Sequence, residues 1–295
     1  MHENEIYTDE TLVRRLIAAQ FPQWKDLPIR YVPSSGTDNA LYQLGDELVV
    51  RLPRIDWATG QVEKEFEWMP NLAPHLPLAI PAPLEMGEPG EGYPWHWAVY
   101  RWLEGENRTI DNVPDPVQTA IDLAEFILAL QKITPTGGSI TSRGKPLSTR
   151  DEATREAIEA LHGMIDTNTV NAAWDSALQA PEWDRPPVWY HGDILPGNLL
   201  FNKGKLSAVI DFSALGVGDP ACDLMIAWNL FTGESRVEFR SVLDVDNATW
   251  ARGRGHALSQ ALIFIPYYLK TNPIGVQNAW RAVNEVLADF SENNG

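Results

Sequence analysis

The amino-acid sequence predicts an α+β fold of two lobes, with an antiparallel sheet in the N-terminal lobe and a mainly helical C-terminal lobe. Short apolar segments of strand length, separated by polar turns, dominate the N-terminal third of the chain, and helical repeats dominate the rest. A length of 295 residues also exceeds the size that one hydrophobic core usually fills. We therefore expect an N-terminal lobe at residues 1–103 and a C-terminal lobe at residues 104–295.

The composition indicates a globular protein that binds neither nucleic acid nor a membrane. Hydrophobic residues make up 44% of the chain and aromatic residues 10%, which is enough to fill two cores. A formal net charge of −17 repels nucleic-acid phosphates and anionic lipid headgroups. Residues 1–7 lack the features of a signal peptide, and no run of about 18 apolar residues occurs. We expect a cytoplasmic protein, and the sequence leaves its oligomeric state open.

The N-terminal lobe should begin with a helix and continue as a sheet. Thr8 or Asp9 can cap a helix that carries apolar residues on one face. A polar segment at residues 34–39 and a tight turn at Gly45 and Asp46 then separate segments with strand character. These expected strands are residues 29–32, 41–44 and 48–52, and a helix is expected at residues 60–72.

Two more strands should complete the sheet. Residues 84–87 and 95–102 flank a Gly- and Pro-rich turn, and residues 103–105 would connect the two lobes. Trp95 and Trp97, which are two residues apart, and Trp102 are three of twelve tryptophans in the chain. Such residues can stack on sugars, but strands beside a core bury them routinely, and we favour core packing.

The C-terminal lobe should consist mainly of helices. Residues 115–132 have the repeat of an amphipathic helix, and residues 134–148 read as a loop. Further helices are expected at residues 151–165 and 169–178, and short strands at residues 188–190, 199–201 and 206–210.

The segment from His191 to Asn198 carries the strongest chemical signal, His-Gly-Asp-Ile-Leu-Pro-Gly-Asn, and apolar strands and Asp211 follow it. Phosphoryl transfer needs a carboxylate to orient the attacking hydroxyl. It also needs an amide and a second carboxylate to hold Mg²⁺ against the phosphates, because positioning and charge neutralisation supply most of the catalysis. Asp193, Asn198 and Asp211 are the candidates for these roles.

This segment resembles the catalytic loop of the aminoglycoside phosphotransferase family, which includes the macrolide phosphotransferases. It is also similar to the H-R-D-x4-N loop of protein kinases. The resemblance extends over residues 30–230 and is strongest over residues 188–228. It implies a bilobal protein-kinase-like fold, ATP and Mg²⁺ as cofactors, and a small hydroxylated molecule as acceptor. Asp193 would then be catalytic, and Asn198 and Asp211 would bind the metal.

The motif Gly218-Asp219-Pro220 continues the family pattern and predicts a helix start. Asp219 is a suitable cap and Pro220 a suitable first residue. By resemblance, Asp223 should brace the backbone of the catalytic loop. We expect structural roles for both carboxylates.

A kinase also needs a cation on the third strand to contact the α- and β-phosphates, and a helix glutamate to hold that cation. The family usually has Lys at this position, whereas this chain has Arg51, and Glu65 matches the helix glutamate. An Arg can contact phosphate oxygens, but its reach and geometry differ from those of Lys. Arg54 is a second candidate.

Two further groups of residues are assigned to the nucleotide. Residues 34–39 occupy the place of a loop that covers the phosphates, and the small residues Ser35 and Gly36 would let backbone N–H groups approach them. From the family register, the backbone of Arg101 and Leu103 should meet the adenine edge.

Several functions stay open. By resemblance, the default acceptor is an aminoglycoside or related antibiotic, which would make the protein an antibiotic-resistance enzyme. The family also includes kinases of macrolides, homoserine and choline. Substrate specificity should reside in residues 134–180 and 234–268. A nucleotide-binding pseudoenzyme that acts as an interaction module is the alternative that Arg51 suggests, and the preference for ATP over GTP is open.

Two other classes fit the sequence poorly. A protein kinase would carry an Ala-Pro-Glu motif and a long activation loop, but only residues 215–219 link Asp211 to the next helix. A zinc site would need Cys or His near His191 at ligand spacing, and the six histidines are scattered.

Overall fold

The protein is described here from a computed structural model, which describes residues 5–33 and 38–294. The predicted loop residues Ser35 and Gly36 lie outside the described residues. The chain forms two compact units. Unit 1 comprises Met1–Glu106, Leu200–Asn202 and Ser207–Ser213, and unit 2 comprises Asn107–Leu199, Lys203–Leu206 and Ala214–Gly295.

Unit 1 contains an antiparallel sheet, which is five-stranded within the described residues and has the order β1-β2-β3-β5-β4. The strands are β1 (Ile29–Val32), β2 (Asn39–Leu44), β3 (Leu48–Pro53), β4 (Pro83–Gly87) and β5 (Trp97–Arg101). The fold class predicted from the sequence is confirmed. The expected strand at residues 95–102 is shorter than predicted, because its partner β4 ends at Gly87, which pairs with Trp97.

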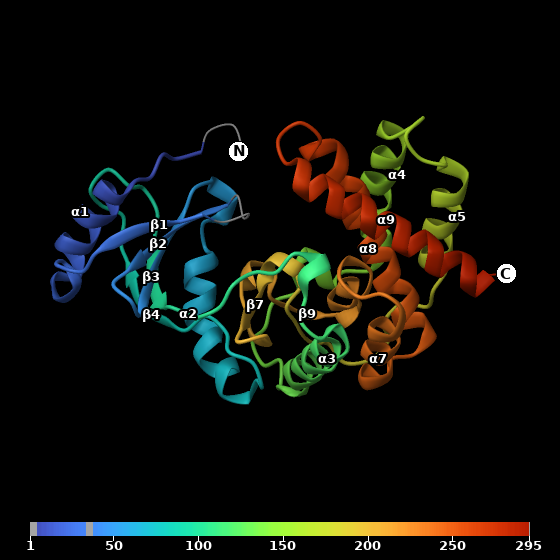
Figure 1. The fold of residues 1–295 in the computed structure, drawn as a ribbon, viewed down its shortest axis with the longest axis horizontal. Helices are drawn as coiled ribbons and strands as arrows, with labels where there is room; N and C mark the ends of the chain where they lie inside the picture. Colours follow the sequence, from blue (N-terminus) through green and yellow to red (C-terminus); the bar gives the residue numbers. More distant parts are fainter. Residues whose placement is uncertain (1–4, 34–37, 295) are drawn as a thin grey trace. The chain divides into compact units, whose positions relative to one another are not determined.

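The helices α1 (Glu10–Gln20) and α2 (Gln61–Leu72) cover opposite faces of this sheet (Figure 1). Asp9 caps α1, since its Oδ1 accepts the Leu12 N–H at 2.7 Å. Successive side chains of a strand point to opposite faces. In β3, Val50 and Leu52 pack with α1, whereas Val49 packs with α2. Arg51 therefore belongs to the face that α2 covers.

Trp97 is fully buried in the core against α1, as favoured for the tryptophans of this strand. It also explains Gly87 on the neighbouring strand, because a Cβ at that position would lie 2.1 Å from the Trp97 ring. The close approach of the indole to the β4 backbone thus requires glycine.

The strands β7 (Leu199–Asn202) and β8 (Lys205–Val209) pair with each other. The residues of these two strands that belong to unit 1 form backbone hydrogen bonds with the rest of that unit. Glu106 and Phe201 exchange two such bonds, at 3.0 and 2.9 Å, and Val209 N–H donates to Ala79 O at 3.0 Å. These contacts attach the chain that leads into Asp211 to unit 1.

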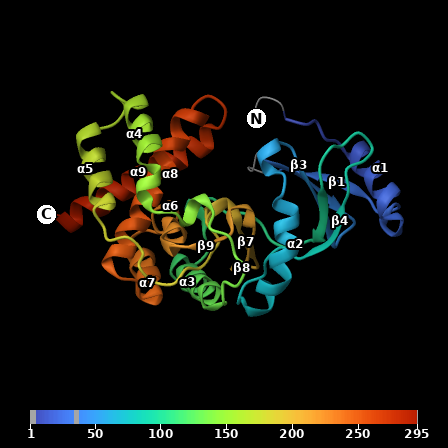
Figure 2. The same ribbon diagram turned by 180° about the vertical axis from the view of Figure 1, so that it is seen from behind.

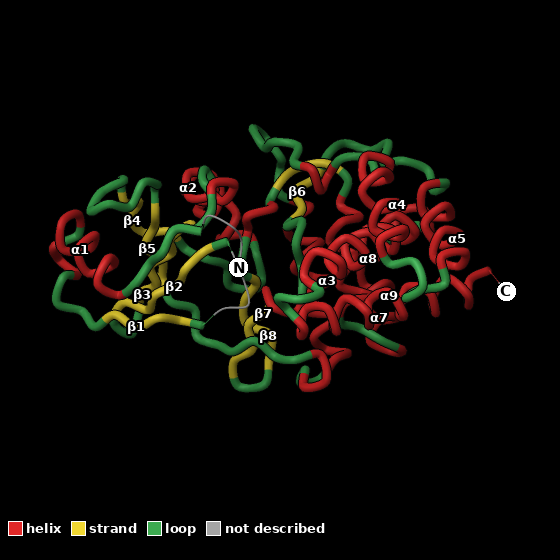
Figure 3. The backbone as a smooth tube through the Cα atoms, turned by 90° about the horizontal axis from the view of Figure 1, so that it is seen from above, coloured by secondary structure: helices red, strands yellow, loops and turns green. Residues whose placement is uncertain are grey.

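Unit 2 is mainly helical (Figure 3). Its helices within the described residues are α3 (Pro116–Lys132), α4 (Asp151–Ala160), α5 (Thr167–Leu178), α6 (Ile226–Asn229), α7 (Gly233–Leu243), α8 (Asn247–Tyr268) and α9 (Pro273–Asn294). The helix α8 contacts α4, α5 and α9, and its pairing with α9 is visible in Figure 2. Most of α8 is buried, so it forms the centre of this unit.

Two details of unit 2 differ from the sequence prediction. Helix α4 ends at Ala160 rather than at residue 165, because Gly163 has a φ of 81° and Asp166 already caps α5 through the N–H groups of Asn168 and Thr169. A short strand, β9 (Gly216–Gly218), pairs with β6 (Val188–Tyr190) and had no sequence signal. In the described part of the chain, no helix has the length and apolar character to cross a membrane.

Candidate active site

Arg51 and Glu65 form a buried ion pair in unit 1. The Arg51 Nη1 lies 2.5 Å from Glu65 Oε1, and the two side chains are 10% and 1% exposed. This confirms the pairing that the sequence predicts, while the role on phosphate stays a prediction. Removing one partner of a buried pair typically costs about 3–5 kcal/mol, since the other charge is left uncompensated.

Neighbouring groups fix both members of this pair. The Tyr100 hydroxyl donates to Glu65 Oε2 at 2.5 Å, and Arg51 Nη2 donates to Gln61 Oε1 at 3.0 Å. Burial alone would lower the pKa of Arg51, but Glu65, Tyr100 and Asp211 raise it overall. Burial and the Glu65 charge also raise the pKa of Tyr100 well above its ordinary value. Arg51 thus stays cationic, and Tyr100 stays protonated as a donor.

Asp211 lies beside the same guanidinium. Its Oδ1 is 3.7 Å from Arg51 Nη2, and its side chain is 37% exposed. Asp211 has a φ of 64°, a left-handed conformation that costs a residue other than glycine about 1–2 kcal/mol. Backbone strain of this kind gathers at functional sites. Unit 1 therefore presents a solvent-accessible carboxylate next to a fixed cation.

Two other cations of unit 1 have different surroundings. Arg54, the second candidate for the phosphate contact, forms an ion pair with Glu5. Lys64, which the sequence analysis did not single out, lies 3.4 Å from Ser213 O through its Nζ. Burial lowers the pKa of Lys64, and the Glu65 charge partly opposes this shift. Its place next to Glu65 in the sequence was the available signal.

The loop from His191 to Asn198, the candidate catalytic loop in unit 2, is held by Asp223. Its Oδ2 accepts the His191 N–H at 2.9 Å, and its Oδ1 accepts the Gly192 N–H at 2.7 Å. The bracing role implied by the resemblance is thereby confirmed. Burial raises the pKa of Asp223 to about 7, although the two N–H groups act in the opposite direction.

Gly192 allows the loop to turn. It has a φ of 84°, and a Cβ at this position would lie 2.7 Å from Ala214 O. The Asp193 N–H then donates to the ring Nδ1 of the buried His191 at 3.2 Å. Three consecutive backbone N–H groups are thus engaged, which fixes the backbone at Asp193.

Asp193 and Asn198 are in direct contact. The Asn198 Nδ2 donates to Asp193 O at 2.8 Å and lies 3.3 Å from Asp193 Oδ2. Because the amide nitrogen is directed toward Asp193, the amide oxygen is the atom left to act as a metal ligand. The Asp193 side chain is 22% exposed, so its carboxylate can be reached from solvent.

Arg143 also contacts Asp193, with its Nη2 at 3.1 Å from Asp193 Oδ1. Arg143 was not predicted as a site residue. The only signal was its position in the loop at residues 134–148, to which specificity was assigned. No pattern in the sequence connects it with a residue 50 positions away.

Asp219 has the structural role predicted for it. It caps the 3-10 helix Pro220–Met225 by accepting the Ala221 N–H, and its Oδ2 lies 2.7 Å from Arg252 Nε. Both side chains are buried. The buried positive charge of Arg252 is therefore neutralised by Asp219 within unit 2.

The backbone groups predicted to meet adenine differ in their hydrogen bonds. The Arg101 N–H donates to Ala82 O at 3.0 Å and is already used. The Leu103 N–H has no hydrogen-bond partner within the described residues. Leu103 is the better candidate for donating a hydrogen bond to a base.

The donor set bears on the kind of metal site. The described residues contain no group of three or more His, Cys, Asp or Glu side chains that could hold a metal ion. Mg²⁺ does not need such a group, because one or two protein oxygens, nucleotide phosphates and water complete its six ligands. The oxygens of Asn198 and Asp211 are chemically suited to that use.

Comparison with solved structures supports the same fold. The GDP and kanamycin complex of APH(2")-IIia has a TM-score of 0.73 at 20% identity, covering 96% of this chain and 99% of that chain. The streptomycin–ATP complex of APH(2")-IIa has a TM-score of 0.62 at 19% identity, covering 92% and 96%. The macrolide 2'-phosphotransferase MphH from Brachybacterium faecium has a TM-score of 0.63 at 21% identity, covering 92% and 97%.

At the level of sequence, the similarity lies in a family model and not in a curated protein. No curated protein sequence matches the chain. A family model described as the phosphotransferase enzyme family matches residues 32–256, which is most of the chain and includes every predicted site residue. The chain belongs to the phosphotransferase enzyme family.

Proposed function

We propose that the protein is an ATP-dependent O-phosphotransferase that acts on a hydroxyl group of a small molecule. The observation that carries this proposal is the fixed catalytic loop of unit 2. Asp223 holds its backbone at 2.9 and 2.7 Å, and Asn198 contacts Asp193, whose side chain stays 22% exposed. A rigid loop with an accessible carboxylate suits a group that positions an acceptor hydroxyl.

Each residue has one proposed role. Asp193 orients the acceptor hydroxyl and receives its proton. Asn198 and Asp211 each offer one oxygen to Mg²⁺, which when bound would neutralise charge on the nucleotide phosphates. Arg51, held by Glu65 at 2.5 Å, contacts the phosphates in place of the Lys usual in the family.

The remaining nucleotide contacts are also proposals. The backbone of Arg101 and Leu103 would meet the adenine edge, and Ser35 and Gly36 would approach the phosphates. Residues 1–103 then form the nucleotide-binding lobe and residues 104–295 the catalytic and substrate-binding lobe. The proposed phosphoryl donor is ATP, and GTP is an alternative donor to be tested. The proposed location is the cytoplasm.

The ligands of the similar structures suggest the class of acceptor. The similar structures carry kanamycin or streptomycin, or belong to a macrolide phosphotransferase. An aminoglycoside or related antibiotic is thus the default acceptor, and macrolides, homoserine-type and choline-type metabolites are alternatives. A nucleotide-binding pseudoenzyme would use none of them.

The test is an acceptor screen with purified protein and Mg-ATP or Mg-GTP, read by release of ADP or GDP. The panel should include aminoglycosides, macrolides, hydroxy acids and sugar phosphates. Asp193→Asn is the control for each active acceptor. Release that depends on both an acceptor and Asp193 supports the proposal, whereas nucleotide binding without any acceptor-dependent release favours the pseudoenzyme.

A further inference from the structure

Two guanidinium groups meet beside Asp193 in unit 2. Arg143 contacts Asp193 Oδ1 through Nη2 at 3.1 Å, and its Nη1 donates to Gln260 Oε1 at 2.6 Å. The Nη2 of Arg150 lies 3.4 Å from the same Gln260 oxygen. A single neutral oxygen accepts from both cations, so the two positive charges lie close together.

Arg150 has no carboxylate partner within the described residues. Its Nε donates to Ser259 Oγ at 2.8 Å, so both of its acceptors, Ser259 and Gln260, are neutral. Burial lowers the pKa of Arg150 to about 10, with a further contribution from the Arg143 charge. The side chain still carries its charge at neutral pH. A largely buried cation without a counter-charge is unfavourable.

A buried histidine near this pair supplies no counter-charge either. His256 is 2% exposed, and neither of its ring nitrogens has a hydrogen-bond partner within the described part of the chain. Burial, together with the charges of Arg150, Arg143 and Arg252, lowers its pKa to about 3. Among the described residues, Asp193 is the one carboxylate that the Arg143–Arg150 pair contacts. Asp223 also lies near Arg143, which lowers its pKa, but both of its oxygens accept backbone N–H groups of the loop. Asp193 is thus the one carboxylate of the described residues that contacts this pair of positive charges directly.

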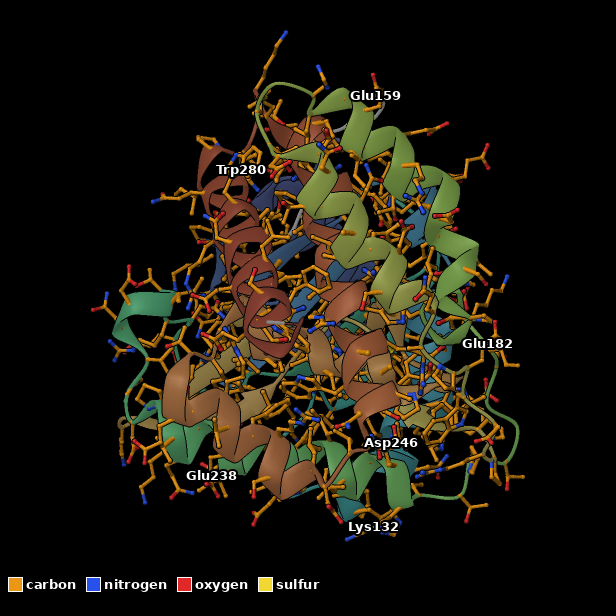
Figure 4. All side chains as sticks on the ribbon, turned by 90° about the vertical axis from the view of Figure 1, so that its right-hand side faces the viewer. Lys132, Glu159, Glu182, Glu238, Asp246 and Trp280 are labelled. Carbon is orange, nitrogen blue, oxygen red and sulfur yellow. The ribbon has the colours of Figure 1, made fainter. Side chains whose placement is uncertain are left out.

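This local charge is opposite to that of the whole chain. The formal net charge is −17, and acidic side chains such as Glu159 and Glu182 lie at the outer surface of unit 2 (Figure 4). An acceptor with several ammonium groups would be repelled by the arginine pair at the point where its hydroxyl must meet Asp193. An acceptor with an anionic group would supply the missing counter-charge.

We infer that the acceptor is an anionic alcohol whose carboxylate or phosphate group binds the Arg143–Arg150 pair while its hydroxyl meets Asp193. The inference rests on the proposed phosphotransfer, and it replaces the default aminoglycoside acceptor by an acceptor of the opposite charge. The planar fork of Arg matches the oxygens of carboxylate and phosphate groups in two parallel hydrogen bonds. Arg143 and Arg150 are thus specificity-determining residues.

The proposed reaction transfers the γ-phosphoryl group of ATP to the acceptor hydroxyl. The acceptor oxygen forms a bond to the γ-phosphorus of ATP, and the bond between that phosphorus and the β–γ bridging oxygen breaks. The hydroxyl proton passes to Asp193 and then to solvent, and ADP leaves. The anionic group of the acceptor stays bound to the arginine pair and is unchanged.

The first test measures anion binding without nucleotide or turnover. Inorganic phosphate and acetate are titrated separately into wild type, Arg150→Gln and Arg155→Gln by calorimetry at low ionic strength. Arg155 pairs with Asp151 and Asp175, so its variant controls for the loss of a charge elsewhere in unit 2. We expect at least one anion to bind wild type and Arg155→Gln with the same affinity. The same anion should bind Arg150→Gln with an affinity about tenfold or more lower, since a charge-assisted hydrogen bond is lost.

The anion that binds identifies the chemistry of the group, phosphate or carboxylate. Because Arg150→Gln can affect folding, Arg150→Lys is measured beside it, and its point charge should retain part of the affinity. Equal binding by wild type and both variants, or no binding of either anion, overturns the inference.

The second test measures turnover with acceptors that differ in charge. Glucose, glucosamine, glucuronate and glucose 6-phosphate form a matched set on one scaffold, and kanamycin is the polycationic comparison. We expect an anionic member to have the highest kcat/KM, and Arg150→Gln to raise the KM for that acceptor about tenfold without changing the KM for ATP.

The outcomes separate the inference from the proposed function. A preference for kanamycin, or an equal effect of Arg150→Gln on every acceptor, overturns the inference and leaves phosphotransfer standing. Arg150-dependent anion binding without ADP release from any acceptor rejects the proposed function and leaves the anion site.

Discussion

Arg51 and Glu65 are joined by an ion pair of 2.5 Å that is almost completely shielded from solvent. We expect Arg51→Ala and Glu65→Ala each to lower kcat/KM for phosphotransfer, because either change disables the same phosphate contact. The double variant should lose much less than the sum of the two losses. Steady-state kinetics of the four proteins checks this, and additive losses would indicate two separate roles.

Arg51→Lys is a finer test of the same contact. Lys is the residue usual in the family, but it replaces a planar fork by a point charge, and Gln61 and Glu65 are arranged around the fork. We expect partial activity, between those of wild type and Arg51→Ala. Full activity of Arg51→Ala would exclude Arg51 as the phosphate contact, and Lys64 would be the next residue to test because Arg54 is paired with Glu5.

Asp193→Asn should lower kcat by about 10²-fold or more while nucleotide affinity stays nearly unchanged. The amide cannot accept the hydroxyl proton, and nothing in the proposed nucleotide contacts involves this side chain. Acceptor-dependent ADP release gives kcat, and a fluorescent nucleotide titration gives the affinity. Comparable turnover in the variant would remove Asp193 from the catalytic role.

Asp211→Ala should weaken the binding of the Mg²⁺–nucleotide complex itself, because it removes a metal ligand. It also removes a negative charge 3.7 Å from Arg51, so metal-free nucleotide should bind no more weakly than to wild type. Titrations with and without Mg²⁺ separate the two effects. If the dependence on Mg²⁺ is unchanged, Asp211 is not a metal ligand.

Gly192→Ala should abolish most of the activity, since the added Cβ would lie 2.7 Å from Ala214 O. Gly163→Ala is the matched control, because Gly163 has a nearly equal φ of 81° but nothing within 4 Å of the added atom. Both variants carry the cost of a left-handed alanine, about 1–2 kcal/mol. A larger loss of stability and activity at Gly192 measures the steric contact, and equal losses would show that the contact is relieved.

Asp223 should make the protein less stable as the pH rises from about 4 to about 7. Its pKa is raised from 3.8 to about 7 in the folded protein, so the folded state holds a proton that the unfolded state has lost. His256, whose pKa is lowered to about 3, opposes this trend below its ordinary pKa. We therefore compare wild type with Asp223→Asn by urea unfolding at pH 5 and pH 7.5, since the His256 contribution cancels in the difference.

Relative to the variant, wild type should lose stability between these two pH values. Asp223→Asn should also lower kcat at both, because one amide oxygen cannot accept two N–H groups and its NH₂ opposes the second. Parallel pH profiles of the two proteins would contradict the raised pKa of Asp223.

Local patterns predicted most of unit 1 and the catalytic loop. Two of these patterns, the alternation of buried and less buried side chains in the strand β2 and the apolar face of α1, depend on residues close in sequence. The hydrogen bond between Asn198 and Asp193 spans only five positions. The ends of elements were less accurate where a left-handed glycine intervened, as at Gly163 after α4. The strand β9 was not predicted, because two of its three residues are glycine.

Long-range contacts could not be read from the sequence without a family pattern. Glu65 and Asp223 were found because the resemblance gives their partners. Arg143 and Lys64 were missed, since their contacts with Asp193 and Ser213 span 50 and 149 positions and belong to no motif. Which arginine of an acidic chain reaches the reaction centre is decided by tertiary packing.

Asp223 lies in the 3-10 helix Pro220–Met225, every residue of which is buried, and that helix leads directly into α6. The buried helical core therefore fixes the backbone of the loop that carries Asp193, and Arg143 and Asn198 contact the carboxylate itself. Exposed residues of the loop at residues 134–148, such as Lys145, can change without disturbing the hydrogen bonds that hold this backbone. A scaffold of this kind can change its contacts with the acceptor while the loop from His191 to Asn198 keeps its conformation.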